Sequence, residues 1–156
     1  MKHILNIFLL LFSFSGISQI FSEEQQYQID SLNSVISNPR IHNTIIVMTY
    51  LEIANYYYLQ VPDTAIVICE KAKGISEKFG FKRGKAESYE WLGYLVKEKG
   101  NVPLALDYYS KSLKIREEIG GKRGIANYLN NVGIIYKNQG DIPKAIDYYH
   151  RSLKIR

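Results

Sequence analysis

The sequence predicts an all-α protein, a right-handed α-solenoid of stacked helix–turn–helix hairpins. Three observations lead to this fold class: a 40-residue internal repeat, apolar residues at helical spacing within each repeat, and glycines where the helical stretches end. The composition is that of an ordinary globular protein, because 46% of the 156 residues are hydrophobic. With only 4 prolines and 11 glycines, the chain has neither a disordered nor a collagen-like composition.

The repeat is seen when residues 80–116 are aligned with residues 120–156. Of the 37 aligned positions, 18 are identical. In the numbering of the first copy they are Gly80, Lys82, Arg83, Gly84, Ala86, Gly93, Lys97, Gly100, Pro103, Ala105, Asp107, Tyr108, Tyr109, Ser112, Leu113, Lys114, Ile115 and Arg116. A weaker copy precedes these two, so the chain contains about three repeats.

Each repeat is predicted to form two helices joined by a glycine-containing turn. In residues 85–99 the apolar side chains fall on one helical face, and Gly100 ends the stretch. Pro103 suits the first turn of the next helix, where a missing N–H costs nothing. That second helix continues with the same period to Gly120. Because a single hairpin cannot bury its own apolar face, the copies must stack.

The last two repeats resemble the tetratricopeptide repeat family. That family carries an aromatic residue, Leu-Gly and Tyr in its first helix, then Ala and a second aromatic residue. The matching positions are Tyr89, Leu92, Gly93, Val96, Ala105 and Tyr109, and again Leu129, Val132, Gly133, Tyr136, Ala145 and Tyr149. The resemblance implies that the glycines permit close helix contact and that Tyr109 and Tyr149 wedge between neighbouring hairpins. The 40-residue period, longer than the usual 34 or so, matches the extended members of the family. The resemblance is identified as one to a bacterial exported subtype.

Five segments are expected along the chain. They are a signal peptide at 1–18, an N-terminal capping helix at 19–40, a degenerate repeat at 41–79, a repeat at 80–119 and a truncated repeat at 120–156. The capping helix is expected because Ile29, Leu32 and Ile36 share one face. The last repeat stops at Arg156, where the previous copy continues. Either the chain is a fragment of a longer protein, the favoured alternative, or its last face packs on a partner.

The first 18 residues have the three-part layout of a secretory signal peptide. Lys2 supplies a positive start, residues 4–14 are nearly all apolar, and Gly16 and Ser18 suit a cleavage site. The apolar stretch is shorter than the 20 or so residues that span a bilayer. We therefore expect a secreted or periplasmic protein whose mature part is not inserted in the membrane. An uncleaved N-terminal anchor is the alternative.

Charge and side-chain chemistry argue against several functions. The net charge of +5 is mild and no basic cluster is interleaved with aromatic residues, which argues against nucleic acid as a partner. The single cysteine, Cys69, cannot form an internal disulfide and is predicted to be a small core residue. His42 and His150 lack Cys or Glu partners at metal-ligand spacing. No catalytic residue, metal site or cofactor is predicted, so the chain is not expected to be an enzyme.

The family resemblance implies a concave groove lined by the first helix of each hairpin. The positions carried over are Asn55, Tyr58, Glu87, Glu90, Tyr94, Lys97, Asn127, Asn130, Asn131, Ile134, Lys137 and Asn138, with Met48, Leu51 and Leu59 also in the first repeat. Asn127, Asn131 and Asn138 fall within about 40° of one another on a helical projection. Asparagine amides can pair with the backbone of an extended chain. A solvated polar face is the alternative.

Two basic pairs, Lys82-Arg83 and Lys122-Arg123, recur at the start of the last two repeats. Their predicted role is to complement the negative end of the preceding helix, with contact to an anionic partner as the alternative.

The expected function is a non-catalytic protein–protein interaction module that holds a peptide or a partner protein in its groove. The alternative is the extracytoplasmic sensing region of a bacterial sensor histidine kinase or related regulator, with a missing C-terminal membrane and kinase portion.

Overall fold

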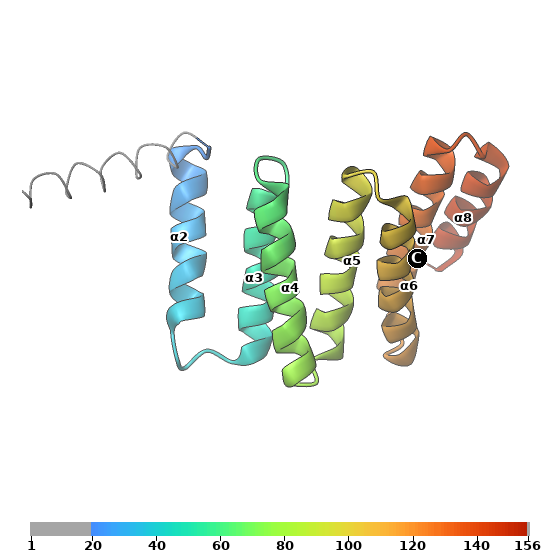
Figure 1. Cartoon of the computed structure of the whole chain (residues 1–156). Helices are drawn as coiled ribbons and strands as arrows, with labels where there is room; N and C mark the ends of the chain where they lie inside the picture. The colour runs from blue at the N-terminus through green and yellow to red at the C-terminus, as the bar shows by residue number, and fades with distance from the viewer. Residues whose placement is uncertain (1–19, 156) are drawn as a thin grey trace, which may run out of the picture. The chain divides into compact units, whose positions relative to one another are not determined.

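The computed structural model describes residues 20–155, and every regular element among them is an α-helix (Figure 1). The helices are α2 (Glu23–Ser37), α3 (Asn43–Tyr57), α4 (Pro62–Lys78), α5 (Lys82–Glu98), α6 (Val102–Glu118), α7 (Lys122–Asn138) and α8 (Ile142–Ile155). The chain divides into two compact units, Met1–Ile41 and His42–Arg156. The predicted signal peptide at 1–18 lies outside the described residues.

In the first unit, α2 begins with a reciprocal side-chain cap. The Ser22 hydroxyl accepts from the backbone N–H of Gln25 at 3.2 Å, and the Gln25 side chain accepts from the N–H of Ser22 at 3.0 Å. This arrangement satisfies two N–H groups that a helix start leaves free. The role of α2 as a cap for the repeats stays a prediction.

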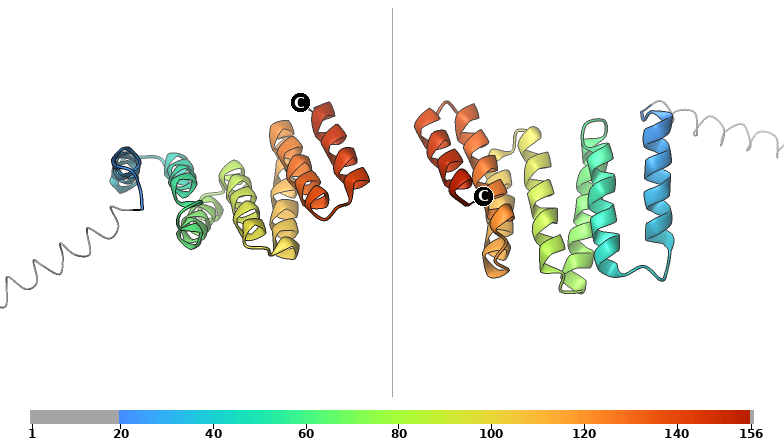
Figure 2. Two further views of the ribbon diagram at one scale, coloured as in Figure 1. Left: turned by 90° about the horizontal axis from the view of Figure 1, so that it is seen from above. Right: turned by 180° about the vertical axis from the view of Figure 1, so that it is seen from behind.

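In the second unit, α3 to α8 form three antiparallel hairpins that follow one another in chain order (Figures 1 and 2). Each of these helices packs on the next one along the chain, and α3 also contacts α5. Every hairpin therefore covers the apolar face of its neighbour, as a repeat array requires. The predicted fold class, an all-α solenoid of stacked hairpins, is confirmed.

A glycine ends a helix every 20 residues, and Gly100 shows why. Its φ is 83°, a left-handed conformation that glycine adopts without steric cost. The Gly100 N–H donates to the carbonyl of Lys97 at 2.8 Å, and the next N–H, of Asn101, donates to Val96 at 2.9 Å. These two bonds form the Schellman motif that closes a helix. The same positive φ recurs at Gly80, Gly120 and Gly140.

The spacing of the two helices in a hairpin depends on a small residue facing a large one. In the second hairpin Gly93 lies under the ring of Tyr109, and in the third Gly133 lies under Tyr149. Tyr109 is buried in one cluster with Ile135 of the following hairpin. The family-based expectation that Tyr109 wedges between hairpins therefore describes only some of its contacts, because the ring also fills the interior of its own hairpin.

Two buried serines join the helices of their hairpins through hydrogen bonds. The Ser112 hydroxyl on α6 donates to the carbonyl of Ala86 on α5 at 2.9 Å. In the next hairpin Ser152 donates to the carbonyl of Ala126 at 2.8 Å. Because both hydroxyls are buried, each needs such an acceptor, and the repeated contact helps to set the register of the two helices.

Candidate functional site

A groove with a volume of about 880 Å³ runs across the first helices of the three hairpins. It is lined by Asn55, Tyr58, Arg83, Glu87, Glu90, Trp91, Tyr94, Arg116, Ile119, Gly121, Lys122, Arg123, Gly124, Asn127 and Asn131. These residues come from α3 and the turn after it, from α5 and α7, and from the end of α6 and the turn that follows it. The groove is thus built by one helix from each hairpin and one helix end.

The structure brings together part of the residue set predicted for the groove. The predicted residues that line it are Asn55, Tyr58, Glu87, Glu90, Tyr94, Asn127 and Asn131. The predicted residues outside its lining are Lys97, Asn130, Ile134, Lys137 and Asn138. Of the predicted asparagine row, Asn127 and Asn131 lie one helical turn apart in the groove, whereas Asn138 is exposed at the end of α7.

The three further residues assigned to the groove in the first repeat lie elsewhere. Leu51 is only 4% exposed and belongs to the core, with Met48 packed against the same cluster. Leu59 is exposed, but it lies in the turn after α3 and does not line the groove. The assignment of Leu51 is wrong because its side of α3 faces the apolar cluster that contains Leu92.

One end of the groove is an aromatic wall of Tyr58, Trp91 and Tyr94. The ring centroids of Tyr58 lie 5.9 Å from Trp91 and 5.8 Å from Tyr94, and those of Trp91 and Tyr94 lie 6.1 Å apart. The rings meet at steep angles, the favourable edge-to-face arrangement, and all three are partly exposed. The wall therefore offers apolar area held by neighbouring rings, suited to an apolar or aromatic side chain of a ligand.

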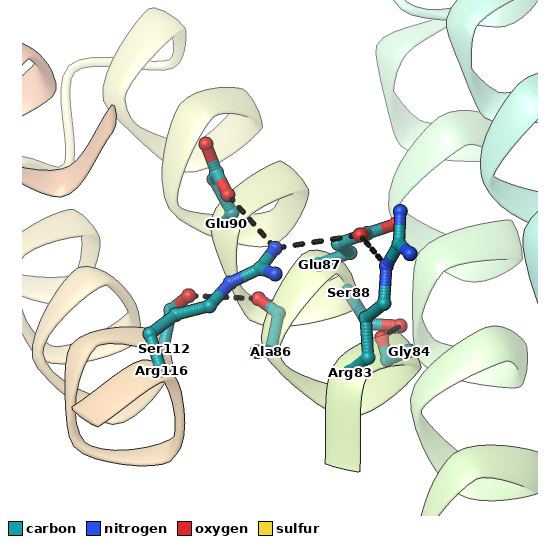
Figure 3. A network of polar contacts seen from close by, with 8 residues as sticks. All are labelled: Arg83, Gly84, Ala86, Glu87, Ser88, Glu90, Ser112 and Arg116. Carbon is teal, nitrogen blue, oxygen red and sulfur yellow. Dashed lines mark hydrogen bonds and ion pairs between the residues drawn. The ribbon is translucent and has the colours of Figure 1, made fainter. Parts of the chain in front are cut away.

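The middle of the groove holds a network of ion pairs around Arg116 (Figure 3). Arg116 reaches from the end of α6 to α5, where its Nη2 lies 3.5 Å from Oε1 of Glu87 and 3.6 Å from Oε2 of Glu90. Arg83 also binds Glu87, with 2.9 Å between Nε and Oε1. The side chain of Arg116 is buried, which is rare for arginine and requires such charged partners.

Burial raises the pKa of Glu90 above the ordinary glutamate value. The positive charge of Arg116 and a hydrogen bond from Asn127 oppose this rise, and the negative charge of Glu87 adds to it. The Glu90 carboxylate is therefore a desolvated charge whose partners compensate only in part.

The basic pairs lie at helix starts. Lys82 and Arg83 are the first two residues of α5, and Lys122 and Arg123 are the first two of α7. Each pair also follows directly on the end of the preceding helix, α4 or α6, so the role predicted for these cations there stays a prediction. Lys82 in addition forms an ion pair with Glu118 of α6 at 3.1 Å.

Sequence reasoning missed Trp91 and Arg116, and only one of them left a usable signal. Trp91 follows Glu87 by four positions and precedes Tyr94 by three, so helical periodicity places it on the groove face. Arg116 belongs to the second helix of its hairpin, from which the family resemblance implies no groove residue. Its position in the groove is seen only in the tertiary structure.

The described helices contain neither a metal-binding cluster nor a membrane-spanning segment. Within residues 20–155, no three His, Cys, Asp or Glu side chains are grouped so that they could hold a metal ion. Among α2 to α8, no helix has the length and apolar character needed to cross a bilayer.

The family model described as tetratricopeptide repeat matches residues 84–156, and the search of curated proteins found no match. A crystal structure of BtubC (BKLC) from P. vanneervenii is similar, with a TM-score of 0.67, 22% identity, and coverage of 83% of this chain and 53% of that chain. A crystal structure of MamA has a TM-score of 0.39 and 18% identity, with coverage of 81% and 85%.

The likeness to BtubC concerns the fold alone, and this chain spans about half of that protein, 53% of its length. The likeness to MamA, at a TM-score of 0.39, is too low to support a shared arrangement. The family match covers the last two hairpins, where the repeat itself is clearest. Residues 84–156 are thus similar to tetratricopeptide repeats, and the likeness to BtubC adds only that the fold is shared.

Proposed function

We propose that this protein is a non-catalytic interaction module that holds an extended peptide or a segment of a partner protein in its groove. Tetratricopeptide repeats generally mediate binding between proteins, and the match over residues 84–156 carries that general role to this chain. The observation that carries the more specific proposal is the aromatic wall, because partly exposed tyrosine and tryptophan side chains are the residues that most often dominate binding energy.

The groove also offers polar groups that suit a peptide backbone. Asn127 and Asn131 project into it from successive turns of α7, and each amide carries both a donor and an acceptor. An extended chain presents one N–H and one C=O per residue, so amides of this kind can bind it without reading its sequence. The wall then supplies the preference for an apolar side chain.

Trp91 provides a direct test because it is the only tryptophan in the chain. Peptides selected from a displayed library by the full chain are titrated while the fluorescence of Trp91 is followed. Peptides in the groove should change the emission, and Tyr94→Ala should weaken their binding by about tenfold or more. Tyr148→Ala, which removes a ring on α8 outside the groove, is the matched control.

The proposal fails if the selected peptides leave the Trp91 emission unchanged and bind the Tyr94→Ala variant as tightly as the original chain. It also fails if Tyr148→Ala weakens binding as much as Tyr94→Ala, because the effect would then report general loss of structure. Circular dichroism of each variant shows whether the helices are retained.

Export through residues 1–18 is proposed on the layout of that segment alone. Mass spectrometry of the protein recovered from its native cells should find a mature N-terminus close to Gln19. An intact N-terminus in the membrane fraction would favour the anchor instead.

The alternative function is the sensing region of a histidine kinase. Reading the coding sequence downstream of Arg156 tests it, because a membrane span and a kinase domain there would support this alternative.

A further inference from the structure

The first turn of α7, residues 121–124, lies in the groove and leaves two of its backbone donors without an acceptor among the described residues. This α7 turn begins at Gly121, and no side chain caps the helix there. The backbone N–H groups of Arg123 and Gly124 find no acceptor within residues 20–155. Free N–H groups and the helix dipole together make such a turn attractive to an anion.

Arg116 lies directly against the α7 turn. It is 9% exposed, and its Nε has no hydrogen-bond partner among the described residues. A Cβ built on Gly124 would be 2.3 Å from that Nε, so only a glycine allows this approach. A buried cation with an unused donor therefore sits beside the positive end of a helix. Its ion pairs to Glu87 and Glu90, at 3.5 and 3.6 Å, are longer than a strong charged hydrogen bond of about 2.8 Å.

The corresponding turn of the preceding repeat, at the start of α5, has different side chains around it. At the start of α5, Phe81 stands where α7 has Gly121, and its ring would lie 2.4 Å from a Cβ on Gly84. Ser76 takes the position of Arg116 and bonds the carbonyl of Ala72 at 2.8 Å. The first turns of α5 and α7 therefore have the same backbone, but an apolar ring lies against the α5 turn and a cation lies against the α7 turn.

The negative partners of this region are also lost between the two repeats. Asn127 stands in the position of Glu87, which binds Arg83 at the start of α5. Lys122 and Arg123 accordingly form no ion pair with any residue between 20 and 155. The groove lining as a whole contains four cations and two carboxylates, a positive excess that lies toward α7.

We propose that the α7 turn, with Arg116, Lys122 and Arg123, binds an oxyanion of the peptide held in the groove, a side-chain carboxylate or a phosphate ester. The oxyanion accepts from the N–H groups of Arg123 and Gly124 and provides the acceptor that Arg116 lacks. This inference rests on the proposed function and adds the ligand chemistry: an apolar residue for the aromatic wall and an acidic residue for the α7 turn.

Three small probes test the site in the full chain by nuclear magnetic resonance. They are N-acetyl-glutamate N-methylamide, the corresponding phosphoserine compound and the neutral glutamine compound. We expect saturable shifts of the Arg123 and Gly124 amide signals with an anionic probe and none with glutamine. The tighter of the two anionic probes identifies the oxyanion. Absence of saturable shifts with both, or equal shifts with glutamine, overturns the proposal.

Gly121→Asp supplies a carboxylate from within the chain and should close the site. Asn101, with nearly the same φ and ψ as Gly121, caps α6 by accepting from the N–H of Leu104 at 3.2 Å. An aspartate at 121 should therefore cap α7 in the same way, raise the melting temperature and weaken the anionic probes by about tenfold or more. Unchanged probe binding in a folded Gly121→Asp variant overturns the proposal.

Arg116→Gln tests the cation, and Arg151→Gln removes the same charge from α8 outside the groove. Only Arg116→Gln should weaken binding of the anionic probes. Equal weakening by both variants would mean a general charge effect and overturn the proposal.

Failure of this inference can be distinguished from failure of the proposed function. Library peptides that change Trp91 fluorescence without binding at the α7 turn contradict the oxyanion site alone. If the full chain binds no library peptide, the proposed function itself is contradicted.

Discussion

The ring of Tyr109 lies so close to the backbone of Gly93 that a Cβ atom built on the glycine would be 2.7 Å from Cδ1 and Cε1 of the tyrosine. Cβ atoms essentially never approach other atoms so closely. The ring itself is 1% exposed and packs in one cluster with Val96, Ala105 and Ile135, so it has little room to move. This pair therefore sets the distance between α5 and α6.

Gly93→Ala should lower the free energy of unfolding by about 1–3 kcal/mol, because the added methyl group forces the Tyr109 ring out of its site. Urea unfolding followed by circular dichroism measures the change. Gly74→Ala is the matched control, since nothing lies within 4 Å of its Cβ position on α4. That variant should gain about 0.5–1 kcal/mol from better helix propensity. Equal effects of the two substitutions would contradict the close contact.

Ser112→Ala should destabilise the protein by about 1 kcal/mol, because the Ala86 carbonyl loses an interhelical donor in a buried place. Ser88→Ala is the comparison, since the Ser88 hydroxyl donates within its own helix, to the carbonyl of Gly84 at 2.8 Å. The first substitution should cost more, because only it removes a link between α5 and α6. A larger loss from Ser88→Ala in thermal unfolding would show that the interhelical bond contributes little.

The Cys69 thiol should react slowly with a disulfide reagent near pH 8 in the folded protein. Burial, with a smaller effect of the Glu70 charge, raises its pKa to about 12, so almost none is the reactive thiolate. The same reagent should modify Cys69 rapidly in concentrated urea, where the thiol regains its ordinary pKa. Rapid modification without urea would mean that α3 and α4 separate readily in the native state.

Glu90 should make stability depend on pH at values just above the ordinary glutamate pKa of 4.5. Because burial raises its pKa in the folded state, the folded chain binds this proton more tightly than the unfolded chain. The contribution of Glu90 to stability is therefore most favourable below the ordinary pKa and falls as pH rises through the folded pKa.

Glu90→Gln lacks this titration, so the stability of the original chain relative to the variant should decline as pH rises through that window. Urea unfolding at a series of pH values measures the difference. A carbon-13 titration of the Glu90 carboxyl group reports the folded pKa directly. A midpoint at or below 4.5 would contradict the incomplete compensation by Arg116 and Asn127.

The helices could be predicted closely because their signals are local. Apolar spacing and the glycines at 100 and 120 mark where the helices end, and a left-handed residue at these places is a property of a few adjacent atoms. The helix starts were predicted less well: α5 begins at Lys82, three residues before the expected position. Its start has no side-chain cap that the sequence could reveal.

The candidate site was predictable only where it follows the face of one helix. Glu87, Glu90 and Tyr94 were placed in the groove because helical spacing and the family resemblance put them on one face, and Trp91 fits the same spacing. Arg116 could not be found in this way, since it enters the groove from the end of a neighbouring helix.

The sequence by itself thus determined the repeat, the helical fold and the stacking of hairpins, since periodicity and turn glycines depend on neighbours along the chain. The tertiary structure alone decided which charges meet. Arg116 reaches Glu87 and Glu90 only because α6 packs on α5, and it rests on Gly124 only because α7 follows with a bare first turn. Contacts of this kind depend on the distance between helices, which a one-dimensional pattern does not contain.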